Sequence, residues 1–409
     1  MERETCVHVE LGGGTEPVGR LYTHVRRGRE TVTFEYETAW LNHAERFALD
    51  PALKLGPGPF HSRADRLLFG AIGDSAPDRW GRALMRRAER RRAAAVPETP
   101  RTLFEIDYLL GVSDEARMGA LRFSDQPGGP FLARPGETCI PPLVDLPRLL
   151  AAAGRVVAEN EDDEDLRLLL APGSSLGGTR PKATVREPDG RLALAKFPHR
   201  ADEWNTVAWE ATALLLAERA GIEVPRFRLE TIAGQDVLVL QRFDRDGAAR
   251  IPYLSAMSMV DATDHETRSY LELADALRRY GARPAADLRQ LWRRIVFTVL
   301  VSNVDDHLRN HGFLFTGMRG WILSPAFDLN PVPVDVRPRV LSTAIDEEDP
   351  TASLDLALGV AGYFDLDSDA ARQIAGEVGR AVADWHRVAA GRGIGKAEIE
   401  RMESAFANV

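Results

Sequence analysis

Residues 295–310 read Ile-Val-Phe-Thr-Val-Leu-Val-Ser-Asn-Val-Asp-Asp-His-Leu-Arg-Asn, an apolar run that changes abruptly into acids and amides. Upstream, apolar residues recur at helical spacing, which predicts a buried helix. These residues are Leu288, Leu291, Trp292, Ile295, Val296, Val299 and Leu300. A group of polar side chains directly after a fully apolar helix calls for a chemical or structural reason. The stretch therefore predicts a buried helix that leads straight into a polar site.

Asp305 and Asn310 have the Asp-x-x-x-x-Asn spacing of a phosphotransferase catalytic loop. In such a loop the aspartate orients the substrate hydroxyl or accepts its proton, and the asparagine oxygen binds Mg²⁺. His307 lies between them and is expected to support the loop, with general-base action as the alternative. This spacing also occurs by chance, so the segment that follows matters.

That segment predicts a hairpin with strands at 312–315 and 321–323 and a turn at 317–320. Folded about residues 318–319, the hairpin returns Asp328 to the side of Asn310. Two carboxylates and an amide then meet, which suits the oxygen-seeking Mg²⁺ ion. The alternative is a set of Asx turns and caps with no ligand.

A glycine-rich loop lies upstream, where residues 173–183 read Gly-Ser-Ser-Leu-Gly-Gly-Thr-Arg-Pro-Lys-Ala. Such a backbone allows close approach to phosphate, although Thr179 occupies the position of the Walker lysine. A flexible connection is the alternative. The next residues predict strands at 183–186 and 192–197 around a turn at 188–190, which places Lys196 opposite Lys182. A lysine within an apolar strand is either an edge residue or a phosphate ligand.

The composition limits the classes of function. The 409 residues carry 52 Lys and Arg against 61 Asp and Glu, a net charge of −9, with 44% apolar residues. This balance indicates a soluble globular protein of two or three domains and argues against a general nucleic-acid-binding surface. Two cysteines exclude a disulfide scaffold, and no apolar segment resembles a signal peptide or a membrane span, so a cytoplasmic protein is expected.

The remaining chain supplies the frame. Three short strands at 6–11, 19–25 and 31–36 precede a helix at 77–92, with Asp74 or Ser75 as the expected N-cap. The arginine run at 86–92 predicts a solvated helix face or, alternatively, a patch for nucleic acid or an acidic partner. The acidic tract at 159–165 predicts an exposed helix end. A Pro- and Gly-rich connection at 125–142, a helix at 204–220, a hairpin at 224–243 and a mostly helical remainder complete the prediction.

The ordered set of motifs resembles the HipA family of type II toxin–antitoxin kinases along nearly the full chain. The matching segments are Ser174-Ser-Leu-Gly-Gly-Thr-Arg-Pro-Lys182, Leu194-Ala-Lys-Phe-Pro198, Gln241-Arg-Phe-Asp-Arg245, Asn303-Val-Asp-Asp-His-Leu-Arg-Asn310 and Leu323-Ser-Pro-Ala-Phe-Asp-Leu-Asn330. Residues 73–82 and 107–123 also look like the N-terminal region of the family. The Asp-x-His-x-x-Asn form is similar to that of phosphatidylinositol 3/4-kinases, to which the family core is akin.

The resemblance implies an α+β fold. A β-rich and helical N-terminal domain of the HipA type would occupy 1–125. A bilobal protein-kinase-like core would follow, with the linker and the N-lobe with its Gly-rich loop at 126–243. A mostly helical C-lobe with the catalytic loop would occupy 244–409.

The resemblance also implies an ATP- and Mg²⁺-dependent serine/threonine protein kinase. Asp305 would be catalytic, Asn310 and Asp328 would hold Mg²⁺, and Lys196 would bind the α and β phosphates. The hinge from Gln241 to Phe243 would contact adenine, although the family often has Glu at the first of these positions. The remaining expected ATP-site residues are Ser175, Gly177, Gly178, Lys182 and His307.

Ser175, or its neighbour Ser174, would match the autophosphorylated serine of the family. A phosphate there adds roughly two negative charges to a loop that must accept ATP, so self-inactivation is expected. The implied partner is a HipB-like helix-turn-helix antitoxin, with DNA reached only through it and no contact with a membrane. The implied substrate is a translation-related protein such as an aminoacyl-tRNA synthetase. The alternatives are a small-molecule or lipid kinase and an inactive pseudokinase that acts as a corepressor.

Overall fold

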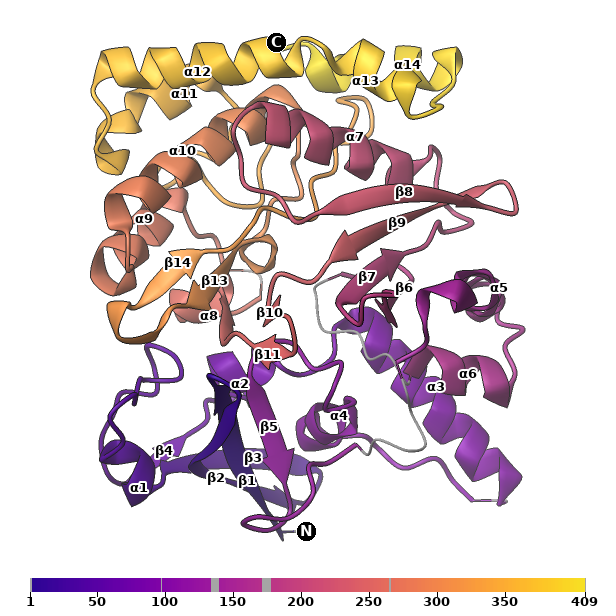
Figure 1. Ribbon diagram of the computed structural model, residues 1–409, viewed down its shortest axis with the longest axis vertical. Coiled ribbons are helices and arrows are strands. Elements are labelled where there is room, and N and C mark those ends of the chain that lie inside the picture. The colour runs from indigo at the N-terminus through magenta and orange to yellow at the C-terminus, as the bar shows by residue number, and fades with distance from the viewer. Residues whose placement is uncertain (1, 97, 134–139, 171–177, 265, 409) are drawn as a thin grey trace. The chain divides into compact units, whose positions relative to one another are not determined.

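The computed structural model describes residues 2–96, 98–133, 140–170, 178–264 and 266–408. The chain forms two compact units. Unit 1 consists of Met1–Arg200, Ile232–Gln235 and Val239–Leu254, and unit 2 of Ala201–Thr231, Asp236–Leu238 and Ser255–Val409. Both contain helices and strands, which confirms the α+β class (Figure 1). The three-part division at 125 and 243 stays a prediction.

Unit 1 begins with a five-stranded sheet in the order β4-β3-β2-β1-β5. Its strands are β1 Glu2–Leu11, β2 Gly14–Arg26, β3 Arg29–Tyr36, β4 Pro59–His61 and β5 Leu121–Ser124. In β3, Val32, Phe34 and Tyr36 are buried while Thr31 and Glu35 are exposed, the alternation of a sheet with one face on a core. The meander of three strands was predicted, and β5 joins it next to β1 from far along the chain.

The helices of unit 1 follow the sheet. They are α1 Thr38–Leu41, α2 Gly70–Asp74, α3 Arg79–Ala95, α4 Glu105–Gly111, α5 Leu146–Val157 and α6 Asp163–Leu170, with the 3₁₀ turn η1 Leu143–Asp145. The N-cap of α3 is Asp78, whose Oδ1 accepts the amide of Gly81 at 2.9 Å. The expectation of Asp74 or Ser75 was wrong because these residues end α2, where the Ser75 hydroxyl donates to the Ile72 carbonyl at 2.8 Å.

The arginine run and the acidic tract neutralise each other. Arg87 on α3 binds the Glu161 carboxylate at 2.9 Å, and Arg91 lies 3.4 Å from Asp163 at the start of α6. Asp165 is held by Arg155 of α5 at 2.6 Å. Glu161 and Asp165 are only 9% and 2% exposed, so the predicted exposed helix end was wrong there. Much of the apparent charge in both segments therefore serves to join helices of unit 1.

A second hairpin carries the two predicted lysines. Strands β6 Lys182–Arg186 and β7 Leu192–Lys196 pair antiparallel with Lys182 opposite Lys196, as predicted. The sheet continues in the order β6-β7-β9-β8, with β8 Phe227–Ile232 and β9 Gln235–Gln241. The short strands β10 Arg245–Asp246 and β11 Ala249–Arg250 form a separate hairpin.

Unit 2 is mostly helical. Its helices are α7 Thr206–Arg219, α8 Ala256–Met259, α9 Tyr270–Tyr280, α10 Pro284–Leu300, α11 Leu354–Gly359, α12 Ser368–Val382, α13 Trp385–Gly391 and α14 Lys396–Met402. Its 3₁₀ turns are η2 Leu308–Asn310, η3 Gly317–Arg319, η4 Ala361–Phe364 and η5 Glu403–Phe406. Helices α7, α10 and α12 lie side by side (Figure 1). Among the described helices, none has the length and apolar character needed to cross a bilayer.

Helix α10 is the central element of this unit. Every residue that the periodicity placed inside is buried, from Leu288 to Leu300. The hairpin of β13 Gly312–Phe315 and β14 Trp321–Leu323 has the predicted ends, with Phe313 opposite Leu323. These strands belong to a small sheet in the order β12-β13-β14, where β12 is Tyr253–Ser255. The segment between α10 and β13 therefore starts and ends on buried elements, which holds it in place.

Candidate functional site

The loop between α10 and β13 brings Asp305 and Asn310 together. The Asn310 side chain is buried in the turn η2, and its Nδ2 donates to the Asp305 carbonyl at 3.1 Å. Its Oδ1 is also buried, and within the described part of the chain it has no hydrogen-bond partner. An orphaned buried amide oxygen is costly unless a ligand uses it. Asn310 therefore closes the loop with one side-chain atom and leaves the other for a ligand.

Asp305 has a different environment. Its carboxylate is 56% exposed and forms an ion pair with Arg337, whose Nη1 lies 3.2 Å away. The turn is maintained by backbone groups: the amide of His307 donates to the Asp305 carbonyl at 2.9 Å, and the amide of Asn310 donates to the His307 carbonyl at 2.8 Å. Asp305 is thus an accessible carboxylate on a fixed turn, as an acceptor for a substrate hydroxyl must be.

His307 contributes to this turn through its backbone. Its ring Nδ1 is buried and has no hydrogen-bond partner among the described residues. Its expected contact with ATP stays a prediction.

Asp328 lies five residues after β14, in a turn that is tied to the same loop. Its φ of +58° is in the left-handed region, which is uncommon for a residue with a side chain and typical of functional turns. Asn330 Nδ2 donates to Asp328 Oδ1 at 3.3 Å, and the amide of Asn330 donates to Asn303 Oδ1 at 2.9 Å. Asn303 precedes Asp305 by two residues, so the Asp328 turn is attached to the start of this loop, while the position of Asp328 beside Asn310 stays a prediction.

A buried network behind the loop escaped the sequence reasoning. Asp306 accepts a hydrogen bond from the Tyr270 hydroxyl, lies 3.1 Å from His311 Nε2, and its carbonyl accepts from Thr343 Oγ1 at 2.7 Å. Burial alone would raise the pKa of the Asp306 carboxyl, but His311 and the Tyr270 hydroxyl hold it below its usual value. Burial, with Asp306 beside it, raises the pKa of Tyr270 well above the usual range. The one sequence feature that could have indicated this network is Asp306 itself, the second acid of the Asp305-Asp306 pair.

These residues fit a magnesium ion. Mg²⁺ prefers oxygen ligands and takes few of them from the protein. The orphaned Asn310 Oδ1 is such a ligand, and the Asp328 carboxylate lies on a turn fastened to the same loop. Within the described residues there is no group of three or more His, Cys, Asp or Glu side chains that could hold a metal ion.

The glycine-rich segment belongs to unit 1. Ser174, Ser175 and Gly177 lie outside the described residues. Gly178 has a φ of +108°, and a Cβ there would lie 3.1 Å from Lys182 Nζ, so a larger residue would be strained. Lys182 is 2% exposed, and its Nζ lies 2.7 Å from Asp78 Oδ2. Asp78 thus caps α3 and anchors the end of the glycine-rich segment.

Lys182 is further fixed by Trp80, whose Nε1 donates to the Lys182 carbonyl at 3.1 Å. This structural role was not expected, and the contact of Lys182 with ATP stays a prediction. Lys196 ends β7 directly opposite, half-buried.

The segment that starts at Gln241 shows a second unexpected role. Gln241 ends β9, and Phe243 contacts the ring of Tyr253. The charged residues between and after them are buried: Arg242 and Asp244 lie 2.6 Å apart, and Asp244 accepts the amide of Gly119 at 2.8 Å. Burial would raise the pKa of Asp244, but Arg242 and Arg245 hold it far below its usual value. Arg242 and Asp244 of this motif therefore have a structural role, as a buried ion pair.

Comparison with known proteins agrees with these features. The sequence profile of the HipA-like C-terminal domain matches residues 174–385, just over half of the chain. A Sinorhizobium fredii protein named "Putative kinase Y4mE" is 28% identical over 338 residues, which cover 75% of this chain and 73% of that protein. A Haemophilus influenzae protein named "Putative kinase" is 26% identical over 198 residues, 42% of this chain and 56% of that protein.

The fold has a counterpart among solved structures. A structure of the Shewanella oneidensis toxin–antitoxin system, HipA with HipB and operator DNA, matches with a TM-score of 0.67 at 16% identity. The match covers 98% of this chain and 95% of that one. The sequence match to the C-terminal domain, together with this shared fold, shows that the chain belongs to the HipA-like family.

Proposed function

We propose that the protein is an ATP- and Mg²⁺-dependent serine/threonine protein kinase and the toxin of a toxin–antitoxin pair. The observation that carries this proposal is the loop of Asp305 and Asn310. An accessible carboxylate and an orphaned amide oxygen lie on one fixed turn, with the Asp328 turn fastened to it. The kinase names of the relatives support the same class of reaction.

In the proposed reaction, the Asp305 carboxylate orients the hydroxyl of the protein substrate and accepts its proton. Asn310 Oδ1 and the Asp328 carboxylate would hold the magnesium ion, which neutralises charge on the phosphates when bound. Lys196 would bind the α and β phosphates, and Gln241 to Phe243 would contact the adenine. Arg337 forms an exposed ion pair with Asp305, and the substrate hydroxyl would displace it.

Self-inactivation would use the glycine-rich segment. A phosphate on Ser175 or Ser174 adds about two negative charges where ATP phosphates must bind. The protein has a net charge of −9. Apart from the lysines and arginines near the glycine-rich segment, we therefore expect little positive charge to compensate the added phosphate. The modified loop would then repel ATP and switch the kinase off.

The partner and the substrate follow the same reasoning. The Shewanella oneidensis protein assembles with HipB and operator DNA, and we propose a HipB-like helix-turn-helix antitoxin for this chain. The acidic net charge favours contact with DNA through that partner only. The proposed substrate is a translation-related protein in the cytoplasm, such as an aminoacyl-tRNA synthetase.

The test is phosphate transfer in the purified protein. Wild type and Asp305→Ala are incubated with Mg-ATP, and phosphorylated residues are mapped by mass spectrometry. Asp369→Ala, at an exposed position of α12, is the control for the loss of one carboxylate. Phosphate on Ser174 or Ser175 in wild type and in the control, but not in Asp305→Ala, supports the proposal. The absence of both transfer and ATP binding in wild type overturns it.

A further inference from the structure

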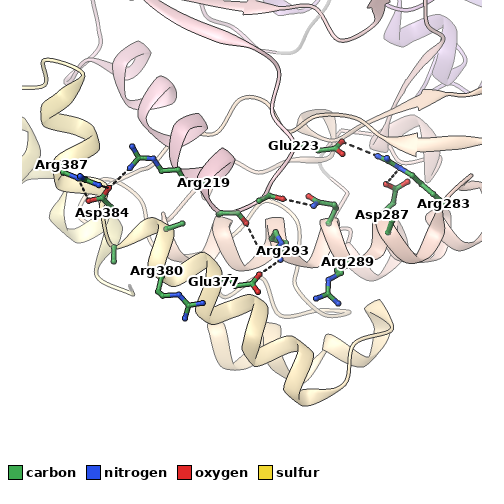
Figure 2. Close-up of a pocket in the computed structure, with 16 residues that line it drawn as sticks. Arg219, Glu223, Arg283, Asp287, Arg289, Arg293, Glu377, Arg380, Asp384 and Arg387 are labelled. Atoms are coloured by element: carbon green, nitrogen blue, oxygen red, sulfur yellow. Dashed lines mark hydrogen bonds and ion pairs between the residues drawn. The ribbon is translucent and has the colours of Figure 1, made fainter.

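A hollow of about 1200 Å³ lies in unit 2. It is lined by the C-terminal end of α7, one face of α10, one face of α12 and the start of α13 (Figure 2). Arg289 on α10 precedes Ser302 by thirteen residues, which corresponds to about 20 Å at the rise of an α-helix. We call this hollow the arginine groove.

Six arginines line the groove against four carboxylates, although the protein as a whole is acidic. The arginines are Arg219, Arg283, Arg289, Arg293, Arg380 and Arg387. On α12, Glu377 and Arg380 are three residues apart and share one face, and Asp384 lies just beyond the end of that helix, before α13. The groove is thus a local surplus of positive charge produced by the periodicity of packed helices.

Internal contacts hold part of the groove in position. Arg293 is only 12% exposed, with one nitrogen 2.7 Å from Glu377 and another donating to the Ala220 carbonyl at 2.8 Å. Asp384 lies 2.6 Å from both Arg219 and Arg387. The hydrogen bond from Arg293 lowers the pKa of Glu377, and that from Arg387 lowers the pKa of Asp384. The frame is therefore ordered before any ligand arrives.

Arg283 lies 3.0 Å from Asp287 and 3.5 Å from Glu223, so Arg289 and Arg380 are the lining arginines that remain after the pairs are formed. Both are exposed, and within the described residues no hydrogen bond or ion pair is recorded for either. Figure 2 places Arg289 on α10 and Arg380 on α12, on either side of Glu377. Two guanidinium groups from facing helices thus border one hollow, and each can form a bidentate contact with an oxyanion.

The rest of the lining narrows the class of ligand. The groove has small alanines, Ala220, Ala286, Ala381 and Ala383, and among the described residues that line it there is no aromatic or large apolar side chain. A protein segment is usually anchored by such side chains, and single-stranded nucleic acid stacks its bases on aromatic ones. The geometry points to a small, soluble polyanion that carries several phosphates, bound by Arg289 and Arg380 on the frame of Arg293 and Asp384.

The test is direct binding in a protein whose proposed ATP site is disabled by Lys196→Ala and Asp328→Ala. The probe is inorganic tripolyphosphate without Mg²⁺, measured by titration calorimetry at low salt. We expect binding that Arg289→Ala with Arg380→Ala weakens at least roughly tenfold, since charge-assisted bonds are lost. Arg86→Ala with Arg90→Ala on α3 removes the same charge from another exposed surface and should leave binding unchanged.

Several outcomes are decisive. An equal loss in the two double variants would show non-specific attraction and overturn the proposal, as would no binding of tripolyphosphate. Binding of duplex DNA or an acidic peptide through Arg289 and Arg380, without tripolyphosphate binding, would replace it by a macromolecular surface. If ATP binds as tightly as tripolyphosphate, the groove recognises the phosphates alone. If ATP binds more tightly, the polyphosphate ligand is a nucleotide. Thermal unfolding of each variant verifies the fold, and no readout depends on kinase activity.

Discussion

Two motif segments of this chain have opposite physical character. Around Asp244, the charges are buried and satisfied: Asp244 and Arg242 are 0% and 1% exposed, and they bind each other and the backbone near Gly119. Around Asp305, the carboxylate is half exposed and Asn310 keeps a buried oxygen without a partner in the described structure. A motif residue whose polar atoms all have partners has a structural role, whereas one that keeps a polar atom without a partner can bind a ligand.

The largest expected effect is the loss of phosphate transfer in Asp328→Ala. Removing a carboxylate ligand of the proposed magnesium ion should lower the rate by about 1000-fold or more, because metal stabilisation of the transition state is worth several kcal/mol. Autophosphorylation with radiolabelled ATP measures this, and Asp369→Ala serves as the exposed control. A rate near that of wild type would show that Asp328 does not hold the metal.

Substitution of Asp244 should lower the stability of the protein. Asp244→Ala leaves Arg242 and Arg245 buried without their shared carboxylate, which should lower the free energy of unfolding by about 3–5 kcal/mol. Denaturant unfolding measures the change, and the corresponding change for Asp305→Ala should stay below about 1 kcal/mol. If the two variants lose equal stability, the contrast between the segments is wrong.

The buried Asp306 should affect how the free energy of unfolding depends on pH. Its folded pKa is depressed, so its ionised form stabilises the fold above the unfolded value of about 3.9, and this contribution is lost as the pH falls through the folded pKa. Asp306→Asn should flatten the acid limb of the unfolding free energy below about pH 4. A limb as steep as that of wild type would assign the acid loss to other carboxylates.

Ser175→Ala tests regulation apart from catalysis. We expect the variant to keep kinase activity toward a substrate and to lose the decline of activity during incubation with ATP, because no phosphate can accumulate at that position. Intact-mass spectrometry and activity followed over the same time course measure both. A variant without any activity would give Ser175 a role other than regulation, and a decline that persists would point to Ser174.

The smallest effect is expected for Arg337→Ala. The ion pair of Arg337 with Asp305 is exposed on both sides, and such pairs contribute about 0–1 kcal/mol. We expect a change in the transfer rate of less than about fivefold, measured with saturating ATP. A much larger loss would make Arg337 part of the reaction itself, beside Asp305.

Local patterns were predictable to within a few residues. The hairpin that pairs Lys182 with Lys196 and the hairpin of β13 and β14 were both recognised, because turn residues and strand lengths set the register of neighbouring segments. The cap of α3 was misplaced because Asp74 and Ser75 belong to the end of the short helix α2, which the sequence analysis did not recognise. Asp306 was missed because a buried network joins residues far apart in the chain.

Short segments of sequence were enough to place the helix that ends at Leu300, the spacing of Asp305 and Asn310, and the family, because periodicity and spacing are properties of such segments. Which charged residues are structural depends on contacts between distant parts of the chain. Lys182 meets Asp78 across 104 positions, Asp244 meets Gly119 across 125, and Arg87 meets Glu161 across 74. A buried charge without a partner is costly in free energy, so each of these charges is paired in the folded protein. Because the partners are distant in the sequence, no local sequence pattern identifies them.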